Sequence, residues 1–267
     1  MLKRRKIDRT ALWEVVDKRF TKVENRLFDW LIGLFKTQEE RYIEAIKVEY
    51  KKTAKEPVEV LNGINKQQML EWHIWKDAAF LEFTELVDEA GKFGLKRAGI
   101  QGAWDVLNPQ VLLFLDEKVF NFANGLTDSI ADALRETLRE AIRNGETIEQ
   151  MTERIQKVFE NTVRGEAPRA RLIARTEATG IVNGGQRLAY QQNADIVEGV
   201  EWLSSKDNRV RPSHQAADGQ QVALDKPFNV GGSLLRFPGD PQGPAREVIN
   251  CRCSILSVLK KEAPKAL

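Results

Sequence analysis

The sequence predicts an α+β fold, with a predominantly helical N-terminal part followed by a small irregular sheet domain packed on a long helix. Apolar residues recur at three- and four-residue steps through most of the first part, which is the spacing of amphipathic helices. After Val200 the pattern changes to short apolar runs separated by Pro, Gly and Asp, which favour strands and tight turns. A chain of 267 residues can form one large or two ordinary domains. We place a boundary between a helical region, 1–126, and a second region, 127–267, with helices over 127–193 and the sheet over 198–260.

The first predicted helix spans about Arg9 to Lys52. This stretch has no Pro and a single glycine, Gly33, near which the helix could be interrupted. It is rich in aromatic residues, which are Trp13, Phe20, Phe28, Trp30 and Phe35. A helical-bundle core is the favoured explanation, because apolar stripes at helical spacing usually pack inside their own chain. The alternative is a surface that docks on a partner ring.

The next helices follow a predicted loop over 55–66, which contains Pro57 and Gly63. Helical patterning resumes from 67 to 93 and again from 109 to 123. The N-terminal half is therefore expected to be mainly helical.

A pair of helices is predicted from its capping residues. Thr127 or Asp128 is expected to open the first helix, and Asn144-Gly145 is expected to end it in the left-handed conformation. Thr147 and Gln150 have the spacing of a capping box, which opens the second helix.

A third helix is expected to begin at Pro168, a residue tolerated at a first helical position, and to run to about Gln192. It contains Gly180, Gly184 and Gly185, and each glycine costs about 1 kcal/mol relative to Ala in a helix interior. Two explanations remain open: a close approach of another backbone, or a break of the helix near Gly184.

Four short extended segments are predicted after this helix, over 200–203, 221–224, 234–237 and 253–259.

Composition and charge exclude several classes of protein. The chain is 42% hydrophobic and 30% charged, which is typical of a globular protein, and its net charge of +2 argues against a general DNA-coating role. Local basic residues such as the run 3–6 and Lys260, Lys261 and Lys265 could contact phosphates without sequence specificity, although solvated chain ends are the favoured interpretation. No apolar run reaches membrane-spanning length. Two cysteines separated by one residue favour a reducing compartment over a disulfide framework.

The segment from Trp202 to Cys253 carries an unusual order of polar, turn-forming and sulfur-containing residues. This block resembles the C-terminal domain of the phage Mu F-like minor head proteins, which include the head morphogenesis proteins of phages related to SPP1. The matching residues are Trp202, Ser205, Asp207, Arg209, Arg211, His214, Asp218, Gly219, Phe228, Pro238, Gly239, Asp240, Pro241, Asn250, Cys251 and Cys253. Upstream, the preceding helix matches at Ala174, Arg175, Thr176, Glu177, Asn183 and Gly184.

The resemblance implies a minor capsid protein of a tailed phage or prophage that acts in head morphogenesis. The implied partners are the portal protein, other capsid or scaffold proteins and, non-specifically, DNA, with no membrane contact. The implied location is the virion head, and the host cytoplasm during assembly. Some family members carry a toxin or enzyme domain after the Cys motif; the short segment after Cys253 leads us to expect none here, and we expect the protein not to be an enzyme.

A zinc site is one interpretation of the sulfur-containing residues. His214, Cys251 and Cys253, joined by Asp207 or Asp218, would offer the imidazole, thiolate and carboxylate ligands that zinc prefers. The favoured alternative is that the cysteines are small buried hydrophobic residues of the last strand, so that the expected cofactor is none, with zinc possible.

Catalysis is the second interpretation of the same segment. The ordered charges of Asp207, Arg209, Arg211 and Asp218, with His214 and Asn250, invite comparison with a metal-dependent nuclease or another nucleic-acid-processing enzyme. Such a site needs a second histidine or an acidic cluster, and the only other histidine is His73 in a helical stretch. A network that stabilises turns is more economical, because Asp caps backbone amides and Arg pairs with carboxylates.

Overall fold

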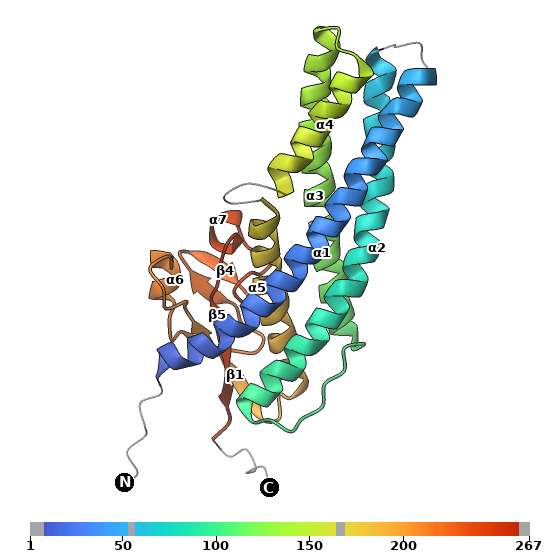
Figure 1. Cartoon of the computed structure of the whole chain (residues 1–267). Helices are drawn as coiled ribbons and strands as arrows, with labels where there is room; N and C mark the ends of the chain where they lie inside the picture. Colours follow the sequence, from blue (N-terminus) through green and yellow to red (C-terminus); the bar gives the residue numbers. More distant parts are fainter. Residues whose placement is uncertain (1–7, 53–56, 164–168, 262–267) are drawn as a thin grey trace. The chain divides into compact units, whose positions relative to one another are not determined.

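The computed structural model describes residues 8–52, 57–163 and 169–261. Five long helices come first, and a region of short strands and helices follows (Figure 1), which confirms the α+β prediction. The long helices are α1 (Arg9–Lys52), α2 (Pro57–Ala98), α3 (Pro109–Arg143), α4 (Ile148–Val163) and α5 (Arg169–Gln192). The short elements are β1 (Val197–Leu203), α6 (Pro212–Ala216), β2 (Gln221–Ala223), β3 (Phe228–Val230), β4 (Ser233–Leu235), α7 (Ala245–Val248) and β5 (Ser254–Leu259).

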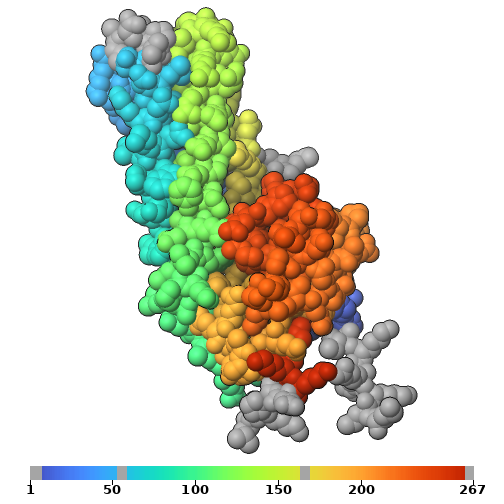
Figure 2. Space-filling model, turned by 180° about the vertical axis from the view of Figure 1, so that it is seen from behind, coloured from blue at the N-terminus to red at the C-terminus, as the bar shows by residue number. Residues whose placement is uncertain are grey.

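The strands form two small antiparallel sheets. Strand β1 lies at the centre of a three-stranded sheet with the order β2-β1-β5, and β3 pairs with β4 in a hairpin. Trp202 of β1 pairs with Ile255 of β5 and points into the core, where both side chains are fully buried. Figure 2 shows much of the segment after Val200 as an orange-to-red surface, and all of these short elements belong to one compact unit. All four predicted extended segments contain a strand, and β3 was missed.

The chain divides into two compact units that do not follow the predicted boundary at residue 126. Unit 1 comprises Met1–Leu27, Phe83–Leu115 and Ile173–Leu267, and unit 2 comprises Phe28–Glu82 and Asp116–Leu172. The difference arises because four of the five long helices, α1, α2, α3 and α5, each contribute residues to both units.

Unit 2 has an aromatic core. The ring of Trp75 on α2 is fully buried and lies 6.1 Å from Trp30, 5.1 Å from Phe35 and 5.9 Å from Phe122, measured between ring centroids. Tyr42 packs against Phe159 at 6.2 Å. These contacts join α1, α2, α3 and α4 through side chains alone.

The aromatic residues of α1 are therefore used inside the chain. Phe20 and Phe35 are buried, and Trp30 packs in the core of unit 2. The centroid of the half-buried Phe28 ring lies 3.6 Å from the guanidinium of Arg171. The Nε1 of Trp13 donates a hydrogen bond to the carbonyl of Arg252. This arrangement agrees with the favoured interpretation, in which the aromatic residues form a helical-bundle core. It does not agree with a docking surface made of the same aromatic residues.

Three helix boundaries differ from the prediction. Helix α1 runs through Gly33 without interruption. Helix α2 begins at Pro57, at a position where proline needs no amide hydrogen, and Gly63 lies inside it, where an added Cβ would come within 3.0 Å of Glu49. Helix α3 passes through Thr127 because the hydroxyl of this residue donates to the Ala123 carbonyl, 2.8 Å away, instead of capping a new helix.

Other local predictions are confirmed. Gly145 ends α3 with a φ of +66°, and the Thr147 amide bonds to Gln150 Oε1 at 2.8 Å as a capping box requires. Pro168, the basic run 3–6 and Lys265 lie outside the described residues. None of the described helices combines the length and the apolar composition that a membrane-spanning segment needs.

Helix α5 is unbroken, and its glycines mark close contacts. A Cβ at Gly184 would lie 2.4 Å from the Phe114 ring, and one at Gly185 would lie 2.8 Å from the Val87 carbonyl. Gly180 meets Gly239, where a Cβ on Gly239 would lie 2.6 Å from the Gly180 nitrogen. The close-approach explanation is confirmed, and the predicted alternative of a helix break is wrong.

Candidate functional site: the motif face of helix α5 and a buried His-Cys cluster

One face of α5 binds the main chain of the segment Asn250–Cys253. The hydroxyl of Thr176 accepts from the Asn250 amide at 3.0 Å, and the hydroxyl of Thr179 donates to the Cys251 carbonyl at 2.6 Å. Asn183 follows one turn later on the same face. The segment before β5 is therefore positioned by side chains of α5 on backbone groups.

Asn183 makes the largest number of these contacts. It is fully buried, and its Nδ2 donates to the carbonyls of Thr179, Pro238 and Cys253 at 3.0 to 3.1 Å. Its Oδ1 accepts from the Ile255 amide at 3.1 Å. A single side chain thus satisfies backbone groups of α5, of the loop at Pro238, of the last residue of the cysteine segment and of β5.

The turn Phe237–Pro241 is stabilised by a buried carboxylate. Asp240 is 1% exposed and accepts from the Arg236 amide at 2.7 Å and from the Gln242 amide at 3.1 Å. The guanidinium of Arg236 pairs with the same carboxylate at 2.5 Å. Gly239 has a φ of +80°, which favours glycine, and it allows the close contact with α5.

Arg175 and Asn250 form a second contact between α5 and the cysteine segment. Arg175 pairs with Glu24 of α1 through two bonds of 3.0 Å and donates to Asn250 Oδ1 at 2.8 Å. Asn250 has a φ of +60°, a left-handed conformation that Asn tolerates. The half-buried Glu177 lies on the same helix.

The other motif charges stabilise loops. Asp207 accepts from the Arg209 amide at 3.0 Å, and its Oδ2 lies 2.6 Å from the guanidinium of Arg252. Arg211 donates to the carbonyl of Ile249. Asp207 therefore turns its carboxylate to Arg252 instead of the cysteines.

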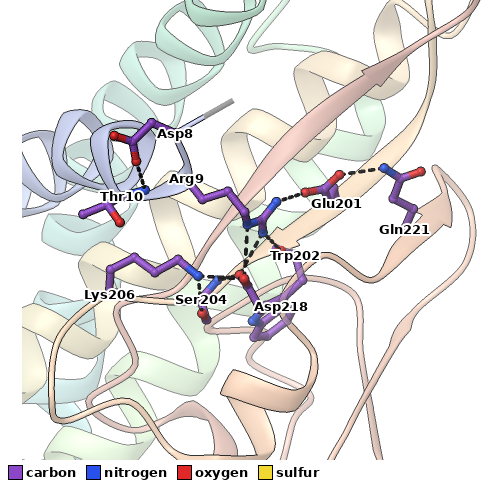
Figure 3. Close-up of polar contacts among 9 residues, drawn as sticks. All are labelled: Asp8, Arg9, Thr10, Glu201, Trp202, Ser204, Lys206, Asp218 and Gln221. Carbon is purple, nitrogen blue, oxygen red and sulfur yellow. Dashed lines mark hydrogen bonds and ion pairs between the residues drawn. The ribbon is translucent and has the colours of Figure 1, made fainter. Parts of the chain in front are cut away.

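The carboxylate of Asp218 forms ion pairs with two basic side chains, those of Arg9 and Lys206 (Figure 3). Its carboxylate lies 2.8 Å from Arg9 Nη2 and 2.7 Å from Lys206 Nζ, and it accepts from the Ser204 amide at 2.8 Å. Arg9 also bonds to the carbonyl of Trp202 at 3.0 Å, and Gly219 follows with a φ of +82°. Burial raises the pKa of Asp218, but the hydrogen bonds from Arg9, Lys206 and Ser204 outweigh it and lower the pKa to about 2.

His214, Cys251 and Cys253 form a buried cluster. Each residue is at most 2% exposed, and the Nδ1 atom of His214 lies 3.4 Å from the sulfur of Cys253 and 3.5 Å from the sulfur of Cys251. The edge of the Trp202 ring packs against His214 at 5.4 Å between centroids. Within the described part of the chain, these three residues form the group with metal-ligand spacing, and neither Asp207 nor Asp218 joins it.

The two thiols of this cluster differ in their acidity. Burial raises the pKa of Cys251, but hydrogen bonds from the side chain and amide of Cys253 outweigh it, so that the pKa is lowered. Burial, together with the neighbouring Cys251, raises the pKa of Cys253 well above its usual value. Cys251 is therefore the sulfur that more readily becomes a thiolate.

Two buried residues of this region were missed by the sequence interpretation. The first is Glu247 of α7, whose carboxylate lies 3.0 Å from His214 Nε2. The second is Arg187 of α5, which donates to the carbonyls of Leu224 at 2.7 Å and Lys226 at 2.8 Å, and also to the carbonyl of Arg236. Burial lowers the pKa of Arg187 to about 10. Arg187 lies four residues after Asn183, a spacing that places both on one face of the helix and could have revealed it.

The fold and this site define a class of protein module. A long helix uses Thr, Asn and Arg side chains to position the backbone of a loop-rich region with two sheets. A Cys-x-Cys segment directly precedes the last strand. Residues 132–256 match the family described as Phage Mu protein F like protein, so this part of the chain is similar to that family.

Three relatives were found among known proteins. The chain is 30% identical over 122 residues to the minor head protein GP7 of Bacillus phage SPP1, covering 45% of this chain and 38% of that protein. It is 24% identical over 153 residues to the NAD(+)–arginine ADP-ribosyltransferase EFV of Enterococcus faecalis, covering 57% and 30%. It is 30% identical over 120 residues to the uncharacterized protein YqbB of Bacillus subtilis, covering 43% and 38%. The chain thus spans about a third of the length of these relatives, and no solved structure matches it significantly.

Proposed function

We propose that the protein acts in head morphogenesis of a tailed phage or prophage, as a minor component of the virion head. The observation that carries this proposal is the match of residues 132–256 to the Mu F-like family, together with the similarity to the SPP1 minor head protein. The host cytoplasm is the expected site of assembly. The proposed mode of action is binding to other head proteins, not turnover of a substrate.

The contacts of the motif residues support a structural role. Several motif side chains form hydrogen bonds with backbone groups of their own chain. These side chains are Thr179, Asn183, Arg187, Arg211 and Asp240. Side chains used in this way are not available to polarise a substrate. This supports a rigid module that presents a fixed surface.

The portal protein is the proposed partner, and an exposed apolar face of α2 in unit 2 is the proposed contact. Leu70 and Leu81 are 58% and 71% exposed and lie eleven residues apart, which is about three helical turns, so they share one face. Met69, the residue before Leu70 in the sequence, is 70% exposed. Large apolar side chains exposed along one helix favour a protein interface there.

Pull-down against the portal protein of the same phage or prophage tests this contact. The double change Leu70→Gln and Leu81→Gln should reduce capture at least tenfold, because it removes apolar area at the contact without touching the core. Glu153→Gln, at an exposed position of α4 outside the proposed contact, is the control and should leave capture unchanged. Equal capture of the double variant and the wild type would overturn the α2 contact, and no capture of the wild type would overturn portal binding.

Non-specific contact with packaged or ejected DNA is the second part of the proposal. Lys260 and Lys261 are exposed after β5, and exposed lysines bind phosphates with a strong dependence on salt. Affinity for random-sequence duplex should fall steeply between low and physiological salt. Undetectable binding at low salt would remove DNA from the proposal.

An enzymatic role is the alternative, and the similarity to an ADP-ribosyltransferase is the observation in its favour, although it covers 30% of that protein. Incubation with NAD(+) and an arginine-rich acceptor tests for transfer, and incubation with plasmid and divalent metal tests for the nuclease activity. The proposal predicts neither modified acceptor nor cut plasmid. Turnover in either assay would replace binding as the primary function.

A further inference from the structure

The arrangement of His214, Cys251 and Cys253 has the dimensions of a metal site. Zinc at about 2.3 Å from sulfur and about 2.0 Å from nitrogen separates an N and an S ligand by about 3.5 Å in a tetrahedron. The Nδ1 atom of His214 lies 3.4 and 3.5 Å from the two sulfurs. We propose that these three side chains bind one zinc ion, with two thiolates and one imidazole nitrogen as ligands.

Glu247 would orient the histidine ligand. Its Oε2 atom lies 3.0 Å from His214 Nε2 and accepts from the Ser213 hydroxyl at 2.9 Å. A carboxylate at Nε2 favours the tautomer with the proton on Nε2, so the lone pair of Nδ1 points to the two sulfurs. Because Glu247 is 6% exposed, the hydrogen-bonded pair is shielded from solvent. This is the outer-shell arrangement that metal-bound histidines usually have.

The two sulfur ligands are also fixed in place. The Cys253 amide donates to the Cys251 sulfur at 3.4 Å, which stabilises negative charge on that sulfur. The carbonyls of Cys251 and Cys253 are bound by Thr179 and Asn183 of α5. The backbone between the two cysteines is therefore preorganised before any ion arrives.

The metal would act as a cross-link. His214 lies on the five-residue helix α6, and the cysteines lie just before β5, 37 and 39 residues later in the chain. The ion would add to the hydrogen bonds by which side chains of α5 already hold the cysteine segment. The three protein ligands leave the fourth tetrahedral position to a water molecule, since no other His, Cys, Asp or Glu of the described residues joins the group. The proposal does not depend on the function in head assembly.

Metal analysis of the reduced full-length protein tests the site. The wild type, purified without chelator and then exposed to zinc and desalted, should carry about one zinc per chain. Cobalt should replace it and give the thiolate-to-metal charge-transfer absorption and the intense visible bands of tetrahedral coordination. Cys253→Ser and Cys251→Ser should each weaken zinc binding at least a hundredfold, and any remaining cobalt complex should have about half of the thiolate charge-transfer absorption, because one of two thiolates is left. A wild type that takes up neither zinc nor cobalt would overturn the proposal and leave a hydrogen-bonded thiol–imidazole cluster.

Two further variants separate metal binding from folding. Glu247→Gln keeps all three ligands and should weaken zinc affinity between about 10- and 100-fold, which is the usual effect of an outer-shell change, while the cobalt spectrum remains tetrahedral. Asp207→Asn removes a nearby carboxylate that pairs with Arg252 and should leave zinc affinity unchanged. Zinc retained at full affinity by the cysteine variants, or lost equally in Asp207→Asn, would contradict the assigned ligands.

Discussion

The core of unit 2 and the motif region of unit 1 reach their order by different means. In unit 2, Trp75 packs against three aromatic rings, and most contacts are between side chains. In the motif region, Asn183 and Asp240 are buried as deeply but bond to backbone amides and carbonyls of irregular segments. Unit 2 also has buried polar contacts, in which the carboxylate of Glu71 accepts from Arg41 at 2.6 Å and from Gln67 at 2.7 Å.

The difference teaches where a substitution is tolerated. Apolar contacts are non-directional, so a ring can be replaced by another of similar size at a small cost. A buried amide that satisfies several backbone groups has no isosteric apolar substitute, because its removal leaves those groups without partners. The predictions below follow from this contrast.

The largest effect is expected at Asn183. The change Asn183→Leu leaves the carbonyls of Pro238 and Cys253 and the amide of Ile255 without their partner, and each unsatisfied buried group costs about 1–3 kcal/mol. Urea unfolding should show a loss of about 4 kcal/mol. Asn161→Leu, at an exposed position of α4, should change stability by less than about 0.5 kcal/mol. A loss below about 1 kcal/mol at Asn183 would mean that its hydrogen bonds do not stabilise this region.

Arg187 should be next in size. Arg187→Met removes the donors to the carbonyls of Leu224, Lys226 and Arg236 but also removes a buried charge, so the two contributions partly offset. We expect a loss of about 2–3 kcal/mol, measured by the same unfolding curves. An increase in stability would show that desolvation of the guanidinium dominates over its three hydrogen bonds.

The matching test in unit 2 is Trp75→Phe. The smaller ring retains the aromatic contacts with Trp30 and Phe35 and leaves a modest cavity, so we expect a loss of about 1–2 kcal/mol by thermal or urea unfolding. If this change cost more than Asn183→Leu, the contrast between the two regions would be wrong.

The smallest effect concerns Asp218 and acid. Its pKa is lowered to about 2 in the folded protein from an ordinary value of 3.8, so the Arg9 and Lys206 contacts stabilise the fold above pH 4 and are lost as pH falls from about 4 to about 2. Because Asp218 is partly exposed, we expect a contribution of about 1 kcal/mol. The stability difference between wild type and Asp218→Asn should shrink over this range. A constant difference would exclude the ionised carboxylate as its source.

The sequence predicts the helical part of the fold well where the signals are local. The glycine turn at Gly145 and the capping box at Thr147 were visible because both depend on neighbouring residues. The start of α2 at Pro57 and the continuity of α3 through Thr127 were missed, because a proline or a threonine favours either a boundary or a helix depending on tertiary contacts.

The site was only partly predictable for the same reason. The resemblance to the Mu F-like proteins drew attention to His214 and both cysteines, and the structure brings these three together. Glu247 was not identified because a lone glutamate in a loop-rich stretch carries no spacing signal. Asp207 was assigned as a possible ligand because zinc accepts carboxylates, but its carboxylate pairs with Arg252, which lies far along the chain.

Hydrogen exchange of the Asn183→Ala variant tests most directly the claim that α5 side chains position the cysteine segment. The claim predicts that amide protection falls by orders of magnitude at Ile255 and over 250–255, whereas the amides of α2 around Trp75 keep wild-type protection. Unchanged protection at Ile255, or an equal loss in both regions, would contradict it.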